Sequence, residues 1–200
     1  MIRFIRILVG SVLLTMALAA CGGRSSSTPS SPQSSAPAAP SLTQTVEAAD
    51  EFSGITLTAR YPEGWVGTGE MFMIVLANSA EAQTAMESGA VTGEHQGVQV
   101  MHLQSFMIGG ANTLEAVYAA IKTDMEGGDM TVGDGETATV AGSPGLRGTV
   151  SGPEANGFFY VGQVGDEFVA VMAAAGQSTA VFQALADAIA ASVTLTSSGE

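Results

Sequence analysis

Cysteine, histidine and basic residues are scarce in this chain of 200 residues. It has one cysteine, two histidines, and six lysines and arginines against 19 aspartates and glutamates. A single cysteine excludes an internal disulfide and the paired-cysteine zinc motifs. The formal charge of −13 repels phosphate groups, so nucleic acid is not an expected partner. Glycine-rich phosphate-binding motifs and the Gly-x-Ser-x-Gly elbow of serine hydrolases are also missing, so no nucleotide cofactor is indicated.

The single cysteine follows what reads as an export signal. Arg3 and Arg6 precede an apolar run, Ile7–Ala17, that is short for a bilayer span of about 20 residues. Leu18-Ala19-Ala20 then leads to Cys21, and this pattern resembles the lipobox of bacterial lipoproteins. The resemblance implies that residues 1–20 are removed and that Cys21 carries acyl chains such as palmitate. The protein would then be extracytoplasmic and held at the membrane of the cell envelope by its lipid. The alternative is an ordinary signal peptide whose cleavage site falls beside a cysteine.

A segment rich in serine and proline comes next. Residues 21–44 contain no large apolar residue before Leu42, so we expect a lipidated cysteine followed by a tether. A coil of about 20 residues has a root-mean-square reach of roughly 25 Å, which keeps the domain near the membrane. Loss of Arg3 and Arg6 with the signal changes the formal charge to −15. That charge favours cations or basic partners, unless it serves solubility alone.

Residues 45–200 are expected to form a single globular domain with many strands. Alternating apolar residues predict strands over Ile55–Tyr61 and Val98–Phe106, and a continuous apolar run predicts a fully buried strand over Met71–Leu76. Further short strands, separated by turn residues, are expected at Met130–Val132, Thr137–Val140, Leu146–Ser151, Phe158–Val164 and Phe168–Ala174. Successive hairpins cannot be parallel, so the sheet should be mainly antiparallel.

Two amphipathic helices are expected to pack on this sheet. Apolar residues recur at helical spacing over 114–125, with Asn112 or Thr113 as the N-cap, and again over 178–192. A shorter helix is expected around Ala80–Met86 within a long excursion. Helices and sheet bury each other's apolar faces, and the predicted fold class is therefore α+β.

Four local features carry a resemblance to a known family. These are the turn Tyr61-Pro62-Glu63-Gly64-Trp65, a mid-chain helix, Gly142-Ser143-Pro144 with Arg147 nearby, and a final helix that runs into Ser192-Val193. Their order resembles that of the PsbP-like family, named for an extrinsic subunit of the photosynthetic oxygen-evolving complex. The resemblance implies an α/β/α sandwich and, because members are mostly non-catalytic, a protein that is not an enzyme.

The sequence offers few residues for chemistry. A metal site could combine Glu94, His95 and His102, because imidazole and carboxylate suit zinc or manganese, although their spacing matches no known motif. The alternative for His102 is a buried sheet histidine, because it alternates with Val98 and Val100. No catalytic set and no resident cofactor are indicated.

Three functional hypotheses follow. The first is a non-enzymatic, lipid-anchored accessory protein that binds an envelope protein or a membrane complex. The second is a module that binds a small ligand or a metal cation, suggested by the acidic charge and the histidines. The third is a hydrolase assembled from dispersed serine, histidine and aspartate residues.

Overall fold

The computed structural model describes residues 40–51, 53–153, 156–177 and 179–197. The predicted signal peptide, Cys21 and nearly all of the predicted tether lie outside the described residues. The chain divides into two units, 1–36 and 37–200, and the second unit is the domain discussed below. Within the described residues, no helix is both long and apolar enough to span a bilayer.

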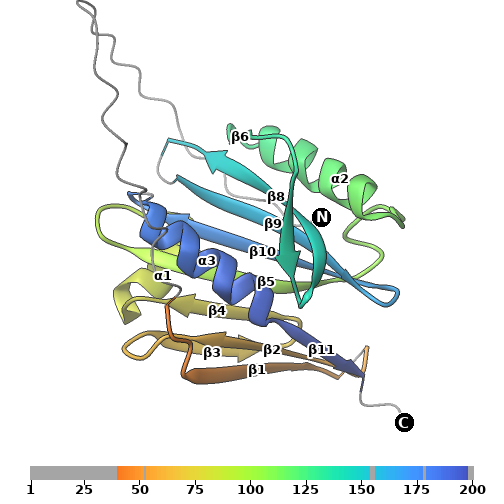
Figure 1. The fold of residues 1–200 in the computed structure, drawn as a ribbon. Coiled ribbons are helices and arrows are strands. Elements are labelled where there is room, and N and C mark those ends of the chain that lie inside the picture. Colours follow the sequence, from red (N-terminus) through yellow and green to blue (C-terminus); the bar gives the residue numbers. More distant parts are fainter. Residues whose placement is uncertain (1–39, 52, 154–155, 178, 198–200) are drawn as a thin grey trace, which may run out of the picture. The chain divides into compact units, whose positions relative to one another are not determined.

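The domain contains two antiparallel sheets (Figure 1). The larger sheet has the strand order β3-β4-β5-β10-β9-β8-β6, with β7 also paired to β8, and the smaller has the order β1-β2-β11. The strands are β1 (Gln44–Asp50), β2 (Ile55–Tyr61), β3 (Val66–Glu70), β4 (Met73–Ala77), β5 (Gln96–Leu103), β6 (Thr131–Val132), β7 (Glu136–Val140), β8 (Ser143–Ser151), β9 (Asn156–Val164), β10 (Glu167–Ala175) and β11 (Thr194–Ser197). Every pairing among the described strands is antiparallel, so the predicted α+β class is confirmed.

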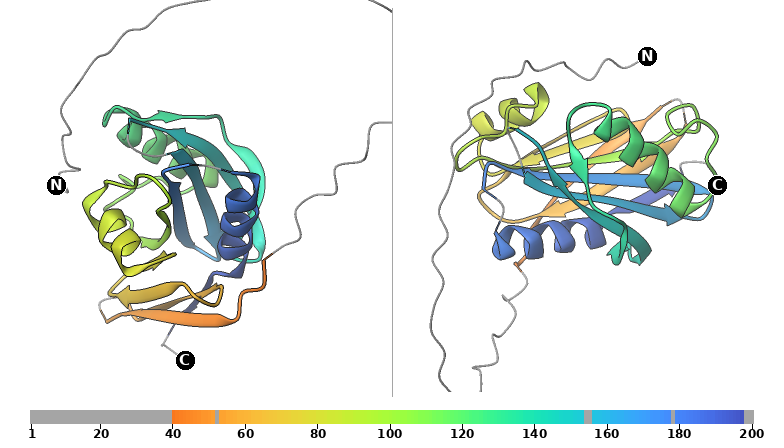
Figure 2. Two further views of the ribbon diagram at one scale, coloured as in Figure 1. Left: turned by 90° about the vertical axis from the view of Figure 1, so that its left-hand side faces the viewer. Right: turned by 90° about the horizontal axis from the view of Figure 1, so that it is seen from above.

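Three helices cover the two faces of the larger sheet. They are α1 (Ala80–Ser88), α2 (Leu114–Glu126) and α3 (Ala180–Ser192). The view from above in Figure 2 shows α1 and α2 on one face and α3 on the other. The arrangement is therefore the expected α/β/α sandwich with two main helices, of 13 residues each, and the shorter α1.

Side-chain alternation along the central strands produces two hydrophobic cores. In β9, Phe158 and Tyr160 enter the core shared with α3 and the smaller sheet, and Phe159 and Val161 enter the core shared with α2. β10 alternates in the same way. Because both faces are covered, these strands consist almost entirely of apolar residues, as a strand buried on both sides requires.

Local sequence signals fix the starts of the helices. Ser79, Thr113 and Thr179 each precede a helix with an extended backbone, and each side chain accepts a hydrogen bond from the backbone N–H three residues later. Thr113, rather than Asn112, is therefore the N-cap of α2. α1 begins at the expected residue but continues beyond Met86, to Ser88.

Several predicted strand boundaries are wrong, and the strand expected from Leu146 begins at Ser143. The apolar run Met71–Leu76 was expected to be one strand, but Met71 has a positive φ of 49° and lies exposed in the turn between β3 and β4. The strand expected to reach Phe106 ends at Leu103. β1 was not predicted as a strand, and it begins at Gln44, the last residue of the predicted tether.

β1 passes very close to β3, and this contact depends on a glycine. A Cβ atom added at Gly69 would lie 2.0 Å from the backbone oxygen of Glu47. Gly69 thus lets the smaller sheet pack closely against the edge of the larger one.

Candidate functional site

A hollow with a volume of about 550 Å³ lies at the right-hand end of the larger sheet in Figure 1. It is bounded by the end of β5, the loop 104–112 that leads to α2, the turn between β9 and β10, and the turn between β1 and β2. We call it the His102 pocket. The polar side chains that line it include Ser53, His102, Gln104, Gln163, Asp166 and Glu167, and none of the described residues that line it is a lysine or an arginine.

His102 is almost completely buried, with 2% of its surface exposed. Its Nε2 lies 2.8 Å from Oε2 of Glu167, whose side chain is 47% exposed, and its Nδ1 is buried and has no hydrogen-bond partner. The register of β5 and β10 pairs His102 with Val169, so Glu167 follows two residues away on the same face. The pair therefore connects the buried sheet to the open side of the pocket.

Asp50 ends β1 and forms the other buried polar group at this end of the domain. It is 3% exposed, and its Oδ2 accepts hydrogen bonds of 2.7 Å from both Ser53 Oγ and Gln104 Nε2. These bonds connect the end of β1, the following turn and the end of β5. Asp50 and His102 are the two buried polar or charged residues in the described part of the chain, and both lie at the His102 pocket.

The loop beside the pocket carries an exposed aromatic side chain. Phe106 is 72% exposed, and it lies between Ser105 and Ile108, which both line the pocket. The three other exposed large apolar residues of the described chain, Met71, Met130 and Val181, belong to other segments. A large aromatic residue in water next to a concave polar site is typical of a surface that contacts another molecule.

The predicted metal candidates are not brought together. His95 precedes β5 and His102 is near its end, and at about 3.4 Å per residue the two are separated by roughly 23 Å. The backbone oxygen of His95 accepts a hydrogen bond from Gly176, and that of the exposed Glu94 accepts one from Asn78. In the described residues, no group of three His, Cys, Asp or Glu side chains could hold a metal ion. The expectation that His102 is a buried sheet histidine matches its position.

The geometry at His102 also gives no support to the hydrolase hypothesis. A serine nucleophile requires a hydrogen bond between its hydroxyl and the imidazole of the base. In the described residues, one ring nitrogen of His102 contacts a carboxylate and the other has no partner. Ser53 donates to Asp50 instead.

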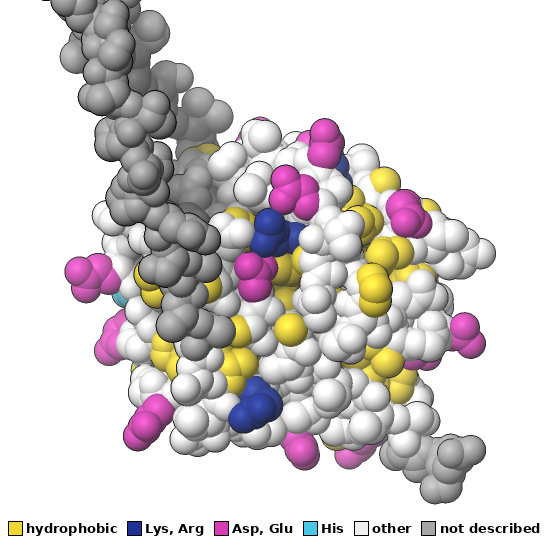
Figure 3. Space-filling model, viewed as in Figure 1, with side chains coloured by type: hydrophobic (Ala, Val, Ile, Leu, Met, Phe, Trp, Pro, Cys, Tyr) yellow, Lys and Arg dark blue, Asp and Glu magenta, His cyan; other side chains and the backbone are white. Residues whose placement is uncertain are grey.

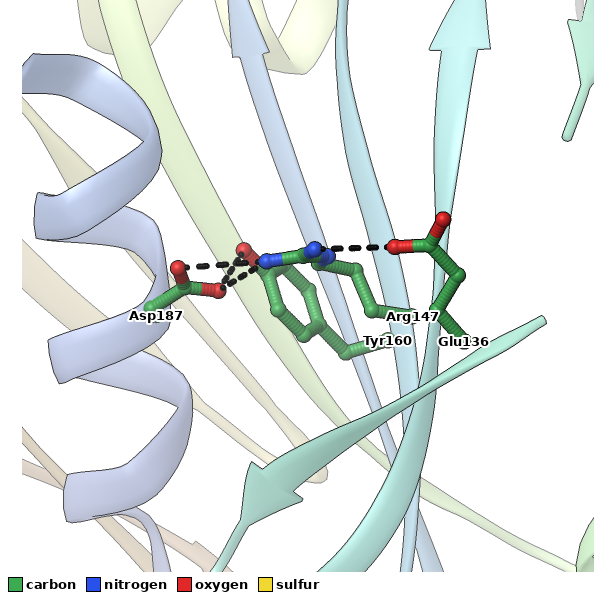
Figure 4. Close-up of polar contacts among 4 residues, drawn as sticks. All are labelled: Glu136, Arg147, Tyr160 and Asp187. Atoms are coloured by element: carbon green, nitrogen blue, oxygen red, sulfur yellow. Dashed lines mark hydrogen bonds and ion pairs between the residues drawn. The ribbon is translucent and has the colours of Figure 1, made fainter. Parts of the chain in front are cut away.

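A second polar cluster lies between α3 and the sheet (Figure 4). Arg147 Nη1 lies 3.1 and 3.2 Å from the two carboxylate oxygens of Asp187, and its Nη2 lies 3.1 Å from Glu136. The buried Tyr160 hydroxyl donates to Asp187 Oδ1 at 2.9 Å. Register pairs Arg147 with Tyr160 on one side and with Glu136 on the other, so the cluster joins three strands to one helix.

Burial and charge determine the ionisation of this Arg147 cluster. Burial, together with the carboxylate of Asp187, raises the pKa of Tyr160 well above its ordinary value. Burial opposes the charge of Arg147, but its hydrogen bonds to Glu136 and Asp187 outweigh that effect, and its pKa is raised. A neutral tyrosine and a charged arginine, both bound to a helical carboxylate, hold α3 to the sheet. We assign this cluster a structural role.

Sequence reasoning missed Asp50, Gln104 and Glu167. Each belongs to a recognisable turn or strand end, but the contact between His102 and Glu167 joins residues 65 positions apart. It depends on β5 pairing with β10, which no local pattern reveals. The turn residues expected between the strands Phe158–Val164 and Phe168–Ala174 place Glu167 next to a strand start, and this was the only available signal.

Comparisons with known proteins give one structural likeness to report. No protein-family model matches the chain, and no curated protein matches it. Among solved structures, the solution structure of cyanobacterial PsbP (CyanoP) from Synechocystis sp. PCC 6803 matches with a TM-score of 0.44 and 16% sequence identity, covering 78% of this chain and 95% of that one. No conclusion about family, activity or partners follows from a likeness at this level.

Proposed function

We propose that the protein is a non-enzymatic accessory protein that an acylated Cys21 anchors outside the cytoplasm. In this proposal the domain binds a protein of the envelope through the His102 pocket and the neighbouring Phe106. The observation that carries the proposal is that the buried residues Asp50 and His102 and the exposed Phe106 lie in or beside one pocket, at which the end of β1 in the smaller sheet meets the end of β5 in the larger sheet.

The character of the pocket favours a macromolecular partner. Interfaces with other proteins are enriched in aromatic residues, and Phe106, which is 72% exposed, lies in the loop that lines the pocket. The loop that carries Phe106 connects the strand β5 to the helix α2. Loops held by a rigid sheet are common binding elements.

The acidic surface supports a basic partner. On the face seen in Figure 3, acidic side chains are scattered widely and basic ones are few. Charges of one sign speed association with an oppositely charged partner and repel anionic lipid headgroups. Attachment to the membrane would therefore rest on the lipid, and the domain would be free to meet a partner.

A crosslinking pull-down from native membranes tests the proposal. The full-length protein carries a tag after Glu200 on a flexible spacer, because Ser197 pairs with Ile55 and β11 therefore ends near the pocket. A Cys21→Ala chain removes the acylation site. Phe106→Ser tests the pocket, and Val181→Ser is its matched control, because Val181 is 69% exposed on α3.

The expected result is one stoichiometric partner that is lost with Cys21→Ala and with Phe106→Ser but kept with Val181→Ser. Equal capture by the two serine variants would show that the pocket is not the docking site. Absence of any partner from all samples would contradict the proposal. It would favour the second candidate, a module for a small cationic ligand, since a volume of about 550 Å³ is within the range of ligand sites.

A further inference from the structure

Three polar side chains that line the His102 pocket donate hydrogen bonds to acceptors within the protein. Gln104 donates from Nε2 to Asp50, and Gln163 donates from Nε2 to the backbone oxygen of Gly165 at 3.1 Å. The hydroxyl of Ser53 also donates to Asp50. Each contact uses one N–H of its amide, and the amide oxygens of Gln104 and Gln163 remain available to accept hydrogen bonds from a visiting molecule.

His102 adds a further acceptor. An ionised carboxylate accepts hydrogen bonds and cannot donate, so the ring nitrogen that meets Glu167 must carry the proton. In a neutral imidazole the other nitrogen, Nδ1, is then an acceptor, and it is buried without a partner. A buried acceptor that no described residue satisfies is uncommon, and it indicates a missing donor.

The charge of the pocket also favours a ligand that donates hydrogen bonds. The carboxylates of Asp166 and Glu167 line it, Asp50 lies directly behind Ser53 and Gln104, and none of the described lining residues is basic. The N-terminus of α2 is nearby and would favour an anion, but Thr113 caps it and Glu115 lies in its first turn. Surplus acceptors combined with negative charge match a cation that carries several N–H groups.

We infer that the His102 pocket binds the guanidinium or ammonium group of an arginine or lysine side chain on the envelope partner. This inference rests on the proposed function and specifies its chemistry. Phe106, at the rim, would contact the apolar stem of that side chain or its charged group. A metal ion is a poorer match, because the described residues provide no set of three ligands.

Nuclear magnetic resonance of the full-length protein in detergent tests this inference with small probes. N-acetyl-arginine amide and N-acetyl-lysine amide are titrated, with N-acetyl-citrulline amide as the neutral control of the same shape. The expected result is a saturable shift of the amide signals of Gln104, Asp166 and Glu167 with a charged probe, and binding of citrulline amide at least tenfold weaker. Glu167→Gln should weaken binding of the charged probe about tenfold.

A matched substitution separates the pocket from the general charge of the surface. Glu87→Gln removes one exposed carboxylate from α1, near the opposite end of β5, and should leave binding unchanged. Equal losses in Glu87→Gln and Glu167→Gln would overturn the inference, as would equal binding of the citrulline and arginine amides. Tighter binding of free putrescine than of either amide, unaffected by Phe106→Ala, would overturn the assignment to a protein side chain.

Failure of the inference can be told apart from failure of the proposed function. A partner captured in the pull-down and lost with Phe106→Ser, together with no binding of the charged probes, would leave the accessory role standing and reject the cationic group. No captured partner, together with probe binding at the pocket, would reject the accessory role. It would also reject a partner's side chain as the source of the cationic group, but the pocket would still be a site for a cationic group.

Discussion

Replacing Asp187 with alanine should destabilise the domain, because this carboxylate is the acceptor on which the Arg147 cluster depends. It accepts two contacts from Arg147 Nη1 and one from the hydroxyl of Tyr160, and it is the contribution of α3 to the cluster. Alanine removes all three contacts at once. The side chain of Arg147 keeps Glu136, but the buried hydroxyl of Tyr160 loses its partner.

The expected loss is about 2–4 kcal/mol of unfolding free energy. An unsatisfied buried hydroxyl costs about 1–3 kcal/mol, and the hydrogen bonds to a charged group contribute about 1.5–3 kcal/mol. The better helix propensity of alanine returns roughly 0.5 kcal/mol. Solvent screening at the side chain of Asp187, which is 39% exposed, lowers the upper end of the sum to about 4 kcal/mol. By contrast Glu136→Ala should cost less than about 1 kcal/mol, because a pair with a side chain that is 73% exposed is largely screened by water.

Urea unfolding of the folded domain, followed by circular dichroism, measures these differences. The double variant Asp187→Ala/Tyr160→Phe should recover at least about 1 kcal/mol relative to the sum of its single variants, because the orphaned hydroxyl is gone. If Asp187→Ala and Glu136→Ala shift the urea midpoint equally, or if the double variant is simply additive, the assignment of an anchoring role to Asp187 is refuted.

Three further outcomes are expected. Because burial raises the pKa of Tyr160, the unfolded chain loses this proton at a lower pH than the folded protein, so stability should be full below pH about 10 and fall above it. In urea titrations at alkaline pH, Tyr160→Phe should reduce the loss of unfolding free energy with rising pH. An unchanged pH dependence would show that Tyr160 is not its cause. Gly69→Ala should lower the unfolding free energy by about 1–3 kcal/mol, because the added Cβ would overlap the backbone of β1. An unchanged urea midpoint would show that β1 can shift freely. Asp50→Ala removes the acceptor of two hydrogen bonds, so faster hydrogen exchange is expected in the loop 104–112. Exchange at the native rate would show that other contacts hold the loop.

Elements whose signals are local were predictable from the sequence. The strand expected over Ile55–Tyr61 has the bounds of β2, because alternation of side chains there is uninterrupted. The starts of α1 and α2 follow from hydroxyl side chains that cap them. In both cases the structure depends on residues that are close together in the sequence, so the sequence pattern alone predicts it.

Features that depend on distant contacts were not predictable. β3 has the sequence Val-Gly-Thr-Gly-Glu, and its two glycines interrupt the alternation of apolar and polar side chains that would predict a strand. Its pairing with β4 and its close packing against β1 hold it in place. The His102 pocket is assembled from four separate segments. His102 itself could be singled out as a sheet histidine, but its partner Glu167 could not, because register between β5 and β10 is a property of the whole sheet.

The direction of β1 determines the distance between the pocket and the point where the chain enters the domain. The strand begins at Gln44 and ends at Asp50, beside the pocket, and six steps of about 3.4 Å separate these residues by roughly 20 Å. β1 thus acts as a rigid spacer in series with the proposed flexible tether, whose own reach is roughly 25 Å. Shortening the tether would reduce the volume that the pocket can search, but the fixed distance along β1 would remain.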